Sequence, residues 1–226
     1  MVADLNLDLG ELEGADGRAR ELALLPYATR INVACGFHAG DEETMRALCA
    51  AARQHRVLVG AHIAYRDREH FGRRALAVDP ATLAAEASEQ LRVLTAVSEM
   101  DLSHVKPHGA LYHHLGADQA AADAVAAAIA DHDQRLAVVT QPGSALAAAA
   151  VDHGLHVLRE GFADRAYDGA GRLRPRSEPG ALLAPAAAAA QARTLAASGT
   201  VDTICVHGDG PEALATVRAV REALGA

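Results

Sequence analysis

The sequence has few aromatic residues, few cysteines and no recognisable nucleotide-binding loop. Tryptophan is absent, phenylalanine occurs three times, and aromatic residues make up 3% of the 226 residues. The core must therefore be built from Leu, Val and Ile beneath Ala-rich helices. No G-x-G-x-x-G follows a predicted strand and no G-x-x-x-x-G-K-[ST] is present, which argues against a dinucleotide cradle and a self-contained P-loop on this chain.

Other absences narrow the class of protein further. The three cysteines, Cys35, Cys49 and Cys205, form no C-x-x-C pair, so they offer no zinc knuckle and suit a reducing compartment. Basic residues (21) are outnumbered by acidic residues (29), which argues against a nucleic-acid partner. Apolar runs such as 120–130 are too short to span a bilayer, and the first residues lack the pattern of a signal peptide. We expect a single cytoplasmic domain over residues 1–226, with no membrane partner.

What is present is an alternation of short apolar runs and helical segments. Helix start signals occur at Asp41, at Asp79-Pro80, at Asp118 and at Pro211, and Gly154 and Gly199 lie where helices should end. Strands that alternate with helices predict an α/β fold with a parallel sheet. The predicted strands cover residues 4–9, 31–34, 57–61, 102–106, 136–140, 156–160 and 203–207.

The positions of the polar residues distinguish a closed barrel from an open sheet. Nearly every predicted strand ends in a charged or imidazole-bearing cluster, whereas an open sheet would concentrate such residues at one switch point. The sequence therefore predicts a seven-stranded (β/α) TIM-like barrel with one site at its C-terminal mouth. The clusters are Asn6/Asp8/Glu11, Asn32/His38/Asp41, His62/Tyr65, Lys106/His108/Tyr112, Glu160/Asp164/Arg165 and His207/Asp209.

Four of the twelve histidines follow a strand directly and lie next to glycine or proline. His38, His62, His108 and His207 occur in GFHAGD, GAH, KPHGALY and VHGDG, where small residues allow tight turns at the barrel mouth. Imidazole and carboxylate groups from separate strands can bind a divalent ion, and Asp8, His38 and His62 are the candidate ligands. The same histidines could equally act as acid-base groups and hydrogen-bond donors without a metal.

The Lys106-Pro107-His108 segment brings a lysine and a histidine to one strand end. Residues two apart on a strand share a face, so both side chains are expected to point the same way. Such a lysine can hold a carboxylate or phosphate, or act as a base if burial lowers its pKa. The alternative is a structural ion pair with Glu160 or Asp164 inside the barrel.

Arginines add local positive charge to an otherwise acidic chain. Arg73 and Arg74 follow a Phe-Gly pair, and Arg165, Arg174 and Arg176 lie in a long irregular stretch. A basic rim around the mouth indicates an anionic substrate or intermediate, although loop arginines are often simply solvated.

Six long motifs resemble those of one family. In chain order they are DLNLDLGE, NVACGFHAGD, GAHIAYRDREHFGRR, HVKPHGALY, EGFADRAYDGAGRLRPRSEPGALL and TICVHGDGPEAL. From Asp4 to about Leu224 the sequence resembles the LamB/YcsF family, the A subunit of the prokaryotic ATP-dependent 5-oxoprolinase. The resemblance implies a barrel similar to the seven-stranded deacetylase and glycosidase barrels. It also implies opening of the 5-oxoproline (pyroglutamate) lactam to L-glutamate, coupled to hydrolysis of ATP (with Mg²⁺), and two partner subunits, B and C.

This activity gives the candidate residues expected roles. The lactam is a poor electrophile, so phosphorylation of its carbonyl oxygen would activate it toward water. Lys106 and the Arg73/Arg74 pair are expected to face phosphate or the substrate carboxylate, and His62 and His108 to transfer protons. The full catalytic set is Asp8, His62, Lys106, His108 and Glu160. The substrate-binding set is Asn6, Asn32, Arg73, Arg74, Tyr112, Arg165 and His207.

The sequence departs from the usual family pattern at three places. Leu7 stands where cysteine is common, Ile63 replaces the usual proline after Gly-Ala-His, and residues 12–22 form a shorter first loop. Leu7 is expected to lie in the barrel wall, whereas the other two are expected at the mouth, where they affect substrate identity. Two alternatives stay open: a metal-dependent amide hydrolase or deacetylase without ATP, and a non-catalytic subunit that binds substrate.

Overall fold

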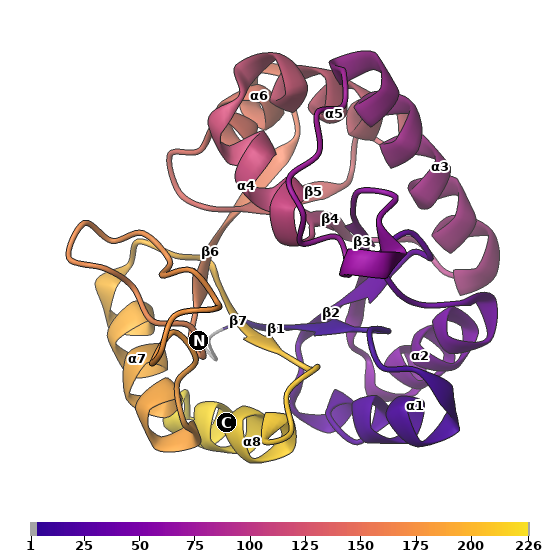
Figure 1. Cartoon of the computed structure of the whole chain (residues 1–226). Coiled ribbons are helices and arrows are strands. Elements are labelled where there is room, and N and C mark those ends of the chain that lie inside the picture. Colours follow the sequence, from indigo (N-terminus) through magenta and orange to yellow (C-terminus); the bar gives the residue numbers. More distant parts are fainter. Residues whose placement is uncertain (1–3, 226) are drawn as a thin grey trace.

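The chain folds into a closed barrel of seven parallel strands surrounded by helices (Figure 1). The structure, a computed structural model, describes residues 4–225. Each strand pairs with the next in sequence, and β7 pairs with β1 to close the barrel. The predicted seven-stranded TIM-like barrel is therefore confirmed, with strand ends within a few residues of those expected. The strands are β1 (Asp4–Leu9), β2 (Arg30–Ala34), β3 (Leu58–Ile63), β4 (His104–Pro107), β5 (Ala137–Thr140), β6 (His156–Phe162) and β7 (Thr203–His207).

Helices connect the strands on the outside of the barrel. Three predicted start signals act as side-chain caps, because the carboxylates of Asp41, Asp79 and Asp118 each accept a hydrogen bond from a backbone N–H of the first turn. No helix within residues 4–225 has both the length and the apolarity needed to cross a membrane. The helices are α1 (Gly14–Leu22), α2 (Glu42–His55), α3 (Pro80–Ser98), α4 (Gly109–Ala117), α5 (Gln119–His132), α6 (Ala145–Asp152), α7 (Pro185–Ser198) and α8 (Ala213–Ala223), with short 3₁₀ turns η1 (Leu25–Tyr27) and η2 (Arg68–His70).

Strand alternation separates an apolar outer layer from a polar barrel interior. In β1, Leu5, Leu7 and Leu9 are fully buried in the main hydrophobic core, while Asn6 and Asp8 hydrogen-bond with residues of other strands inside the barrel. Leu7 thus lies in the barrel wall, as expected. Ile63 also belongs to this core, so the expectation that it lies at the mouth was wrong. Its side chain points to the helices because it alternates with His62.

A long irregular segment between β6 and α7 lies beside the mouth of the barrel. Residues 163–184 contain two isolated antiparallel bridges, Arg165 with Leu182 and Tyr167 with Leu173. In Figure 1 this segment is the orange loop next to β6 and α7. The bridges fold it back on itself and hold Arg165 at the rim of the barrel.

The barrel interior leaves no room for a side chain at Gly60. A Cβ atom there would lie 2.3 Å from ring atoms of His104, whose Nε2 is hydrogen-bonded to Asn32 at 2.8 Å. We therefore predict that Gly60→Ala lowers the free energy of unfolding by about 1–3 kcal/mol, as overpacking does elsewhere. Denaturant unfolding would measure the loss. Gly169→Ala, at an exposed position with nothing within 4 Å, is the control and should change stability far less; an equal loss in both variants would contradict the packing argument.

Candidate active site at the barrel mouth

A cavity of about 770 Å³ opens where the strands end. Its walls include Asp8 of β1, His62 of β3, Lys106 of β4 and His207 of β7, together with His108 just after β4. Strands in a parallel barrel bring their carboxyl ends to one rim, so residues distant in sequence meet there. The volume lies within the range typical of small-molecule sites.

Lys106 is buried at the centre of this cavity between two carboxylates. Its Nζ lies 2.8 Å from Asp8 Oδ1 and 2.8 Å from Glu160 Oε1, and 3.1 Å from the Cys205 Sγ. Burial alone would lower the pKa of the Lys106 ammonium, but Asp8, Cys205 and Glu160 raise it well above its usual value. This raised pKa favours the charged ammonium form of Lys106 and supports a role as a fixed cation over a role as a base. Of the two alternative ion pairs, the one with Glu160 is present, and Asp8 is a second carboxylate partner of Lys106.

Below the ion pair, amide and hydroxyl groups form a hydrogen-bonded floor. Asn6 Nδ2 donates to Thr203 Oγ1 at 2.9 Å, and Asn32 Nδ2 donates to Asn6 Oδ1 at 2.8 Å and to Asp8 Oδ1 at 2.7 Å. His104 Nε2 lies 2.8 Å from Asn32 Oδ1. Asn6 and Asn32 do not line the cavity; Asn32 hydrogen-bonds Asp8 directly, and Asn6 supports Asp8 through Asn32. Sequence reasoning missed His104; its i, i+2 spacing from Lys106 was the available signal.

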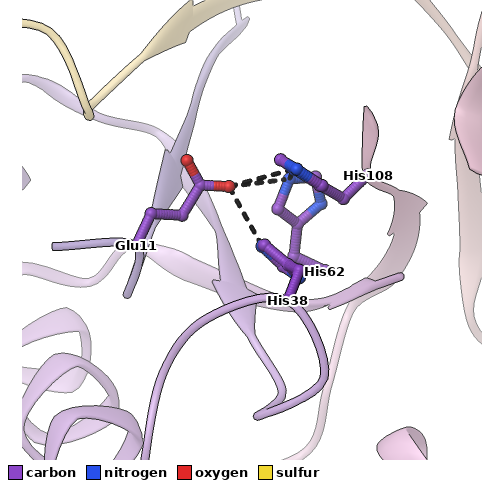
Figure 2. Close-up of side chains that lie close together, drawn as sticks. All are labelled: Glu11, His38, His62 and His108. Carbon is purple, nitrogen blue, oxygen red and sulfur yellow. Dashed lines mark hydrogen bonds and ion pairs between the residues drawn. The ribbon is translucent and has the colours of Figure 1, made fainter. Parts of the chain in front are cut away.

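A second buried cluster joins Glu11 to three histidines (Figure 2). Glu11 Oε1 lies 3.1 Å from His38 Nε2, 3.6 Å from His62 Nε2 and 3.0 Å from His108 Nδ1. Gly10, with φ of 83°, makes the turn after β1 that directs Glu11 back to the mouth. As Figure 2 shows, the three rings gather on one side of the Glu11 carboxylate.

These four side chains could bind a metal ion, because their ligand atoms all lie within 4.8 Å of one another. The metal trio expected from the sequence was Asp8, His38 and His62. The structure instead groups His38 and His62 with Glu11 and His108, while Asp8 is held by Lys106. Glu11 lies in the turn after β1, and a sequence pattern does not predict the direction of such a turn. For this reason the sequence predicted Asp8 as the carboxylate of the cluster, where the structure has Glu11.

Burial controls the protonation of the cluster. Burial, followed by the neighbouring His108, lowers the pKa of His38 to about 3, and burial also lowers the pKa of His108. Burial would raise the pKa of the Glu11 carboxyl, but His108 and His38 hold it well below its usual value. These shifts favour neutral rings at His38 and His108 beside an ionised Glu11 carboxylate.

The predicted arginines differ in their partners. Arg73 and Arg176 both form ion pairs with Asp209 at 2.8 Å, and Arg74 lies 3.4 Å from Asp67 outside the cavity lining. Arg165 lines the cavity and is 8% exposed, and its Nη2 donates to the Arg174 carbonyl at 2.7 Å. Within residues 4–225, Arg165 has no carboxylate partner at ion-pair distance and its Nε has no hydrogen-bond acceptor.

Glu160 and Tyr112 lie where two cavities approach each other. Tyr112 lines the first cavity, and Glu160 lines a second one of about 920 Å³ beside the segment that follows β6. The Tyr112 hydroxyl and Glu160 Oε2 have no hydrogen-bond partner within residues 4–225. Burial, followed by the nearby Glu160, raises the pKa of Tyr112 well above its usual value, so this hydroxyl stays protonated.

A closed parallel barrel whose mouth holds buried carboxylates, a lysine and several histidines defines a (β/α)-barrel protein with an enzyme-like site. More narrowly, the chain belongs to the LamB/YcsF family, whose family model matches residues 3–226.

Two relatives and one solved structure carry functional names. The chain is 45% identical over 239 residues to a protein from Symbiobacterium thermophilum named as the A subunit of 5-oxoprolinase, covering 99% of this chain and 92% of the relative. It is 44% identical over 241 residues to a protein of the same name from Nocardia farcinica, covering 100% and 96%. The solved structure of a lactam utilization protein from Thermus thermophilus superposes with a TM-score of 0.89 at 36% identity, covering 99% of this chain and 96% of that one.

The His207–Asp164 pair should make stability depend on pH. His207 Nδ1 lies 2.9 Å from Asp164 Oδ2; burial would lower the pKa of His207, but Asp164 raises it above its usual value. The pair therefore stabilises the fold fully below the unfolded pKa of about 6.5, and this stabilisation is lost as pH rises through the folded pKa. We predict that the free energy of unfolding falls more steeply above neutral pH in the native chain than in His207→Gln.

Denaturant unfolding at a series of pH values measures this slope. His153→Gln, which alters a partly exposed pair with Asp123, is the control and should keep the native slope. Identical slopes in the native chain and His207→Gln would refute the assignment.

Proposed function

We propose that this chain is the A subunit of a 5-oxoprolinase that opens the 5-oxoproline lactam to L-glutamate with hydrolysis of ATP. The observation that carries the proposal is 43–45% identity, over nearly the whole chain, to relatives that bear this name. The lactam utilization protein of similar structure supports the same substrate class. A cavity of small-molecule size at the barrel mouth, with charged side chains in its lining, supplies a place for the substrate.

The reaction requires an activated carbonyl. Transfer of the terminal phosphoryl group of ATP to the lactam oxygen releases ADP and makes the ring carbon electrophilic. Water adds to that carbon, the C–N bond breaks with proton transfer to nitrogen, and a second water releases phosphate from the acyl phosphate. The products are glutamate, ADP and phosphate.

Each residue of the site has a separate role in this proposed reaction. In this proposal Asp8, which lines the cavity, accepts a proton from the attacking water, and Lys106 supplies positive charge beside it. The guanidinium of Arg165, which has no carboxylate partner within residues 4–225 and a free Nε donor, would bind the substrate carboxylate. Tyr112 lines the same cavity and stays protonated, so its hydroxyl can donate to an oxyanion, and Glu160 holds the far side of Lys106.

We place the ATP-binding site in the assembled complex of subunits and not within this chain alone. This chain has no recognisable phosphate-binding loop, so Mg²⁺-ATP would bind on partner subunits B and C or between them and this chain. The buried, unpaired cysteines suit the cytoplasm, where such a complex would act.

The test is reconstitution with candidate B and C subunits from the same genome. We expect glutamate and ADP to appear in equal amounts only when all three proteins, 5-oxoproline and Mg²⁺-ATP are present. No glutamate from a mixture of folded subunits would refute the proposal.

The Glu11–histidine cluster favours a second candidate, a metal-dependent amide hydrolase that works without ATP. Amide or lactam hydrolysis by this chain alone, with no nucleotide, would identify it. A non-catalytic role predicts that substitutions in the site change substrate affinity but leave the rate of the chemical step unchanged.

Arg165 provides a sharper test of substrate recognition. We predict that Arg165→Met raises KM for 5-oxoproline by roughly 10- to 100-fold. This is the loss of affinity expected when one charge-assisted hydrogen bond to a carboxylate is removed. 2-Pyrrolidinone, which is the same lactam without the carboxylate, should be used equally poorly by both proteins. Arg174→Met is the control, because this arginine lines the same cavity but is paired with Glu178. An unchanged KM in Arg165→Met would remove this residue from the binding site.

A further inference from the structure

We propose that Glu11, His38, His62 and His108 bind one divalent transition-metal ion of the zinc class. This inference rests on the geometry of the four side chains, so it stands or falls independently of the lactam activity proposed above.

Two backbone carbonyls fix the tautomers of two rings. His62 Nδ1 lies 3.0 Å from the carbonyl oxygen of Lys106, and His108 Nε2 lies 2.9 Å from that of Phe71. A carbonyl oxygen only accepts, so these two nitrogens carry the ring protons. In the neutral rings, the remaining nitrogens, His62 Nε2 and His108 Nδ1, each present a lone pair. Hydrogen bonds of this kind to carbonyl groups are those that orient metal-binding histidines.

The two lone pairs face each other and a carboxylate oxygen. His62 Nε2 and His108 Nδ1 are 3.1 Å apart, and they lie 3.6 Å and 3.0 Å from Glu11 Oε1. Three acceptors gathered in a buried site repel one another unless a cation lies between them. Metal bonds of about 2.1 Å in a tetrahedron place ligand atoms about 3.4 Å apart, close to the separations seen here. His38 Nε2, 3.1 Å from Glu11 Oε1, completes the set of four.

The surrounding charges also favour a cation. Asp8, Glu11 and Glu160 are buried carboxylates, and Lys106 is the buried ammonium between two of them. Carboxylates thus outnumber the ammonium group beside these four side chains, and a divalent ion bound there would offset the excess. Asp8 adds to the attraction, because its Oδ2 lies 3.5 Å from His62 Nε2.

The donor set selects the kind of ion. Three imidazole nitrogens and one carboxylate oxygen suit Zn²⁺, Co²⁺, Fe²⁺ or Ni²⁺, whereas Mg²⁺ and Ca²⁺ require mainly oxygen ligands. Such an ion lowers the pKa of a water that binds to it. The role of His62 and His108 is then to hold the ion, in place of the proton transfer expected from the sequence.

Cobalt binding to the purified full-length chain tests the proposal without any activity assay. After removal of metals with a chelator, titration with Co²⁺ should produce visible absorption bands that saturate at one ion per chain. Zn²⁺ should abolish these bands by displacement, and a large excess of Mg²⁺ should not. His108→Ala and Glu11→Gln should each weaken Co²⁺ binding by at least about 100-fold, since loss of an outer partner already costs 10- to 100-fold.

His113→Ala is the matched control, because this histidine lines the same cavity but lies outside the cluster. It should bind Co²⁺ as the native chain does. Circular dichroism and thermal melting of each metal-free variant establish that it is folded, and added Zn²⁺ should raise the Tm of the native chain and His113→Ala only. The proposal is overturned if the native chain binds no stoichiometric Co²⁺, or if the folded cluster variants bind it as tightly as the native chain.

Discussion

The ion pair of Lys106 with Asp8 and Glu160 is the interaction on which the rest of the site depends. It joins β1, β4 and β6 across the interior of the barrel, and all three side chains are buried. Removing one partner from such a group typically costs about 3–5 kcal/mol, because the charges that remain are buried without compensation. The backbone carbonyl of the same Lys106 also fixes the ring of His62. One residue therefore positions both the carboxylate that faces the cavity and a histidine of the neighbouring cluster.

Because the interior of the barrel is polar, the hydrophobic burial that stabilises the fold lies outside the strands. The interior of a TIM-like barrel is commonly filled by Val, Ile and Leu, whereas here asparagine, histidine and lysine occupy it. The hydrophobic core lies instead between the strands and the helices, where the leucines of β1 and residues such as Leu91, Val125 and Ile129 pack. The site can thus carry many charged groups because the layer outside the strands provides the apolar burial.

The sequence was sufficient to predict the barrel but not the grouping of its site residues. Short apolar runs predicted the strands, and start signals at three aspartates and at Pro211 predicted four of the helices, because both kinds of signal are local. The loop expected over residues 12–22 is mostly the helix α1. The helix that starts at Gly109 was missed since it follows β4 at once, with His108 in the flanking position and no side-chain cap. Which polar residues meet depends instead on turns and register. Glu11 joins the histidines because Gly10 turns the chain, and Ile63 was misplaced because its neighbour His62 faces inward, so alternation sends Ile63 outward.

The turn at Phe71 and Gly72 connects the buried cluster to the protein surface. Both residues have positive φ, 55° and 63°, and this conformation presents the Phe71 carbonyl to His108. A Cβ at Gly72 would lie 3.0 Å from the Cβ of His38 and 3.1 Å from the ring of His108, so the turn packs against two histidines of the cluster. Arg73 and Arg74, 40% and 54% exposed at their side chains, follow directly. The orientation of a buried histidine ring is therefore set by the backbone of a turn whose next two residues are exposed at the surface.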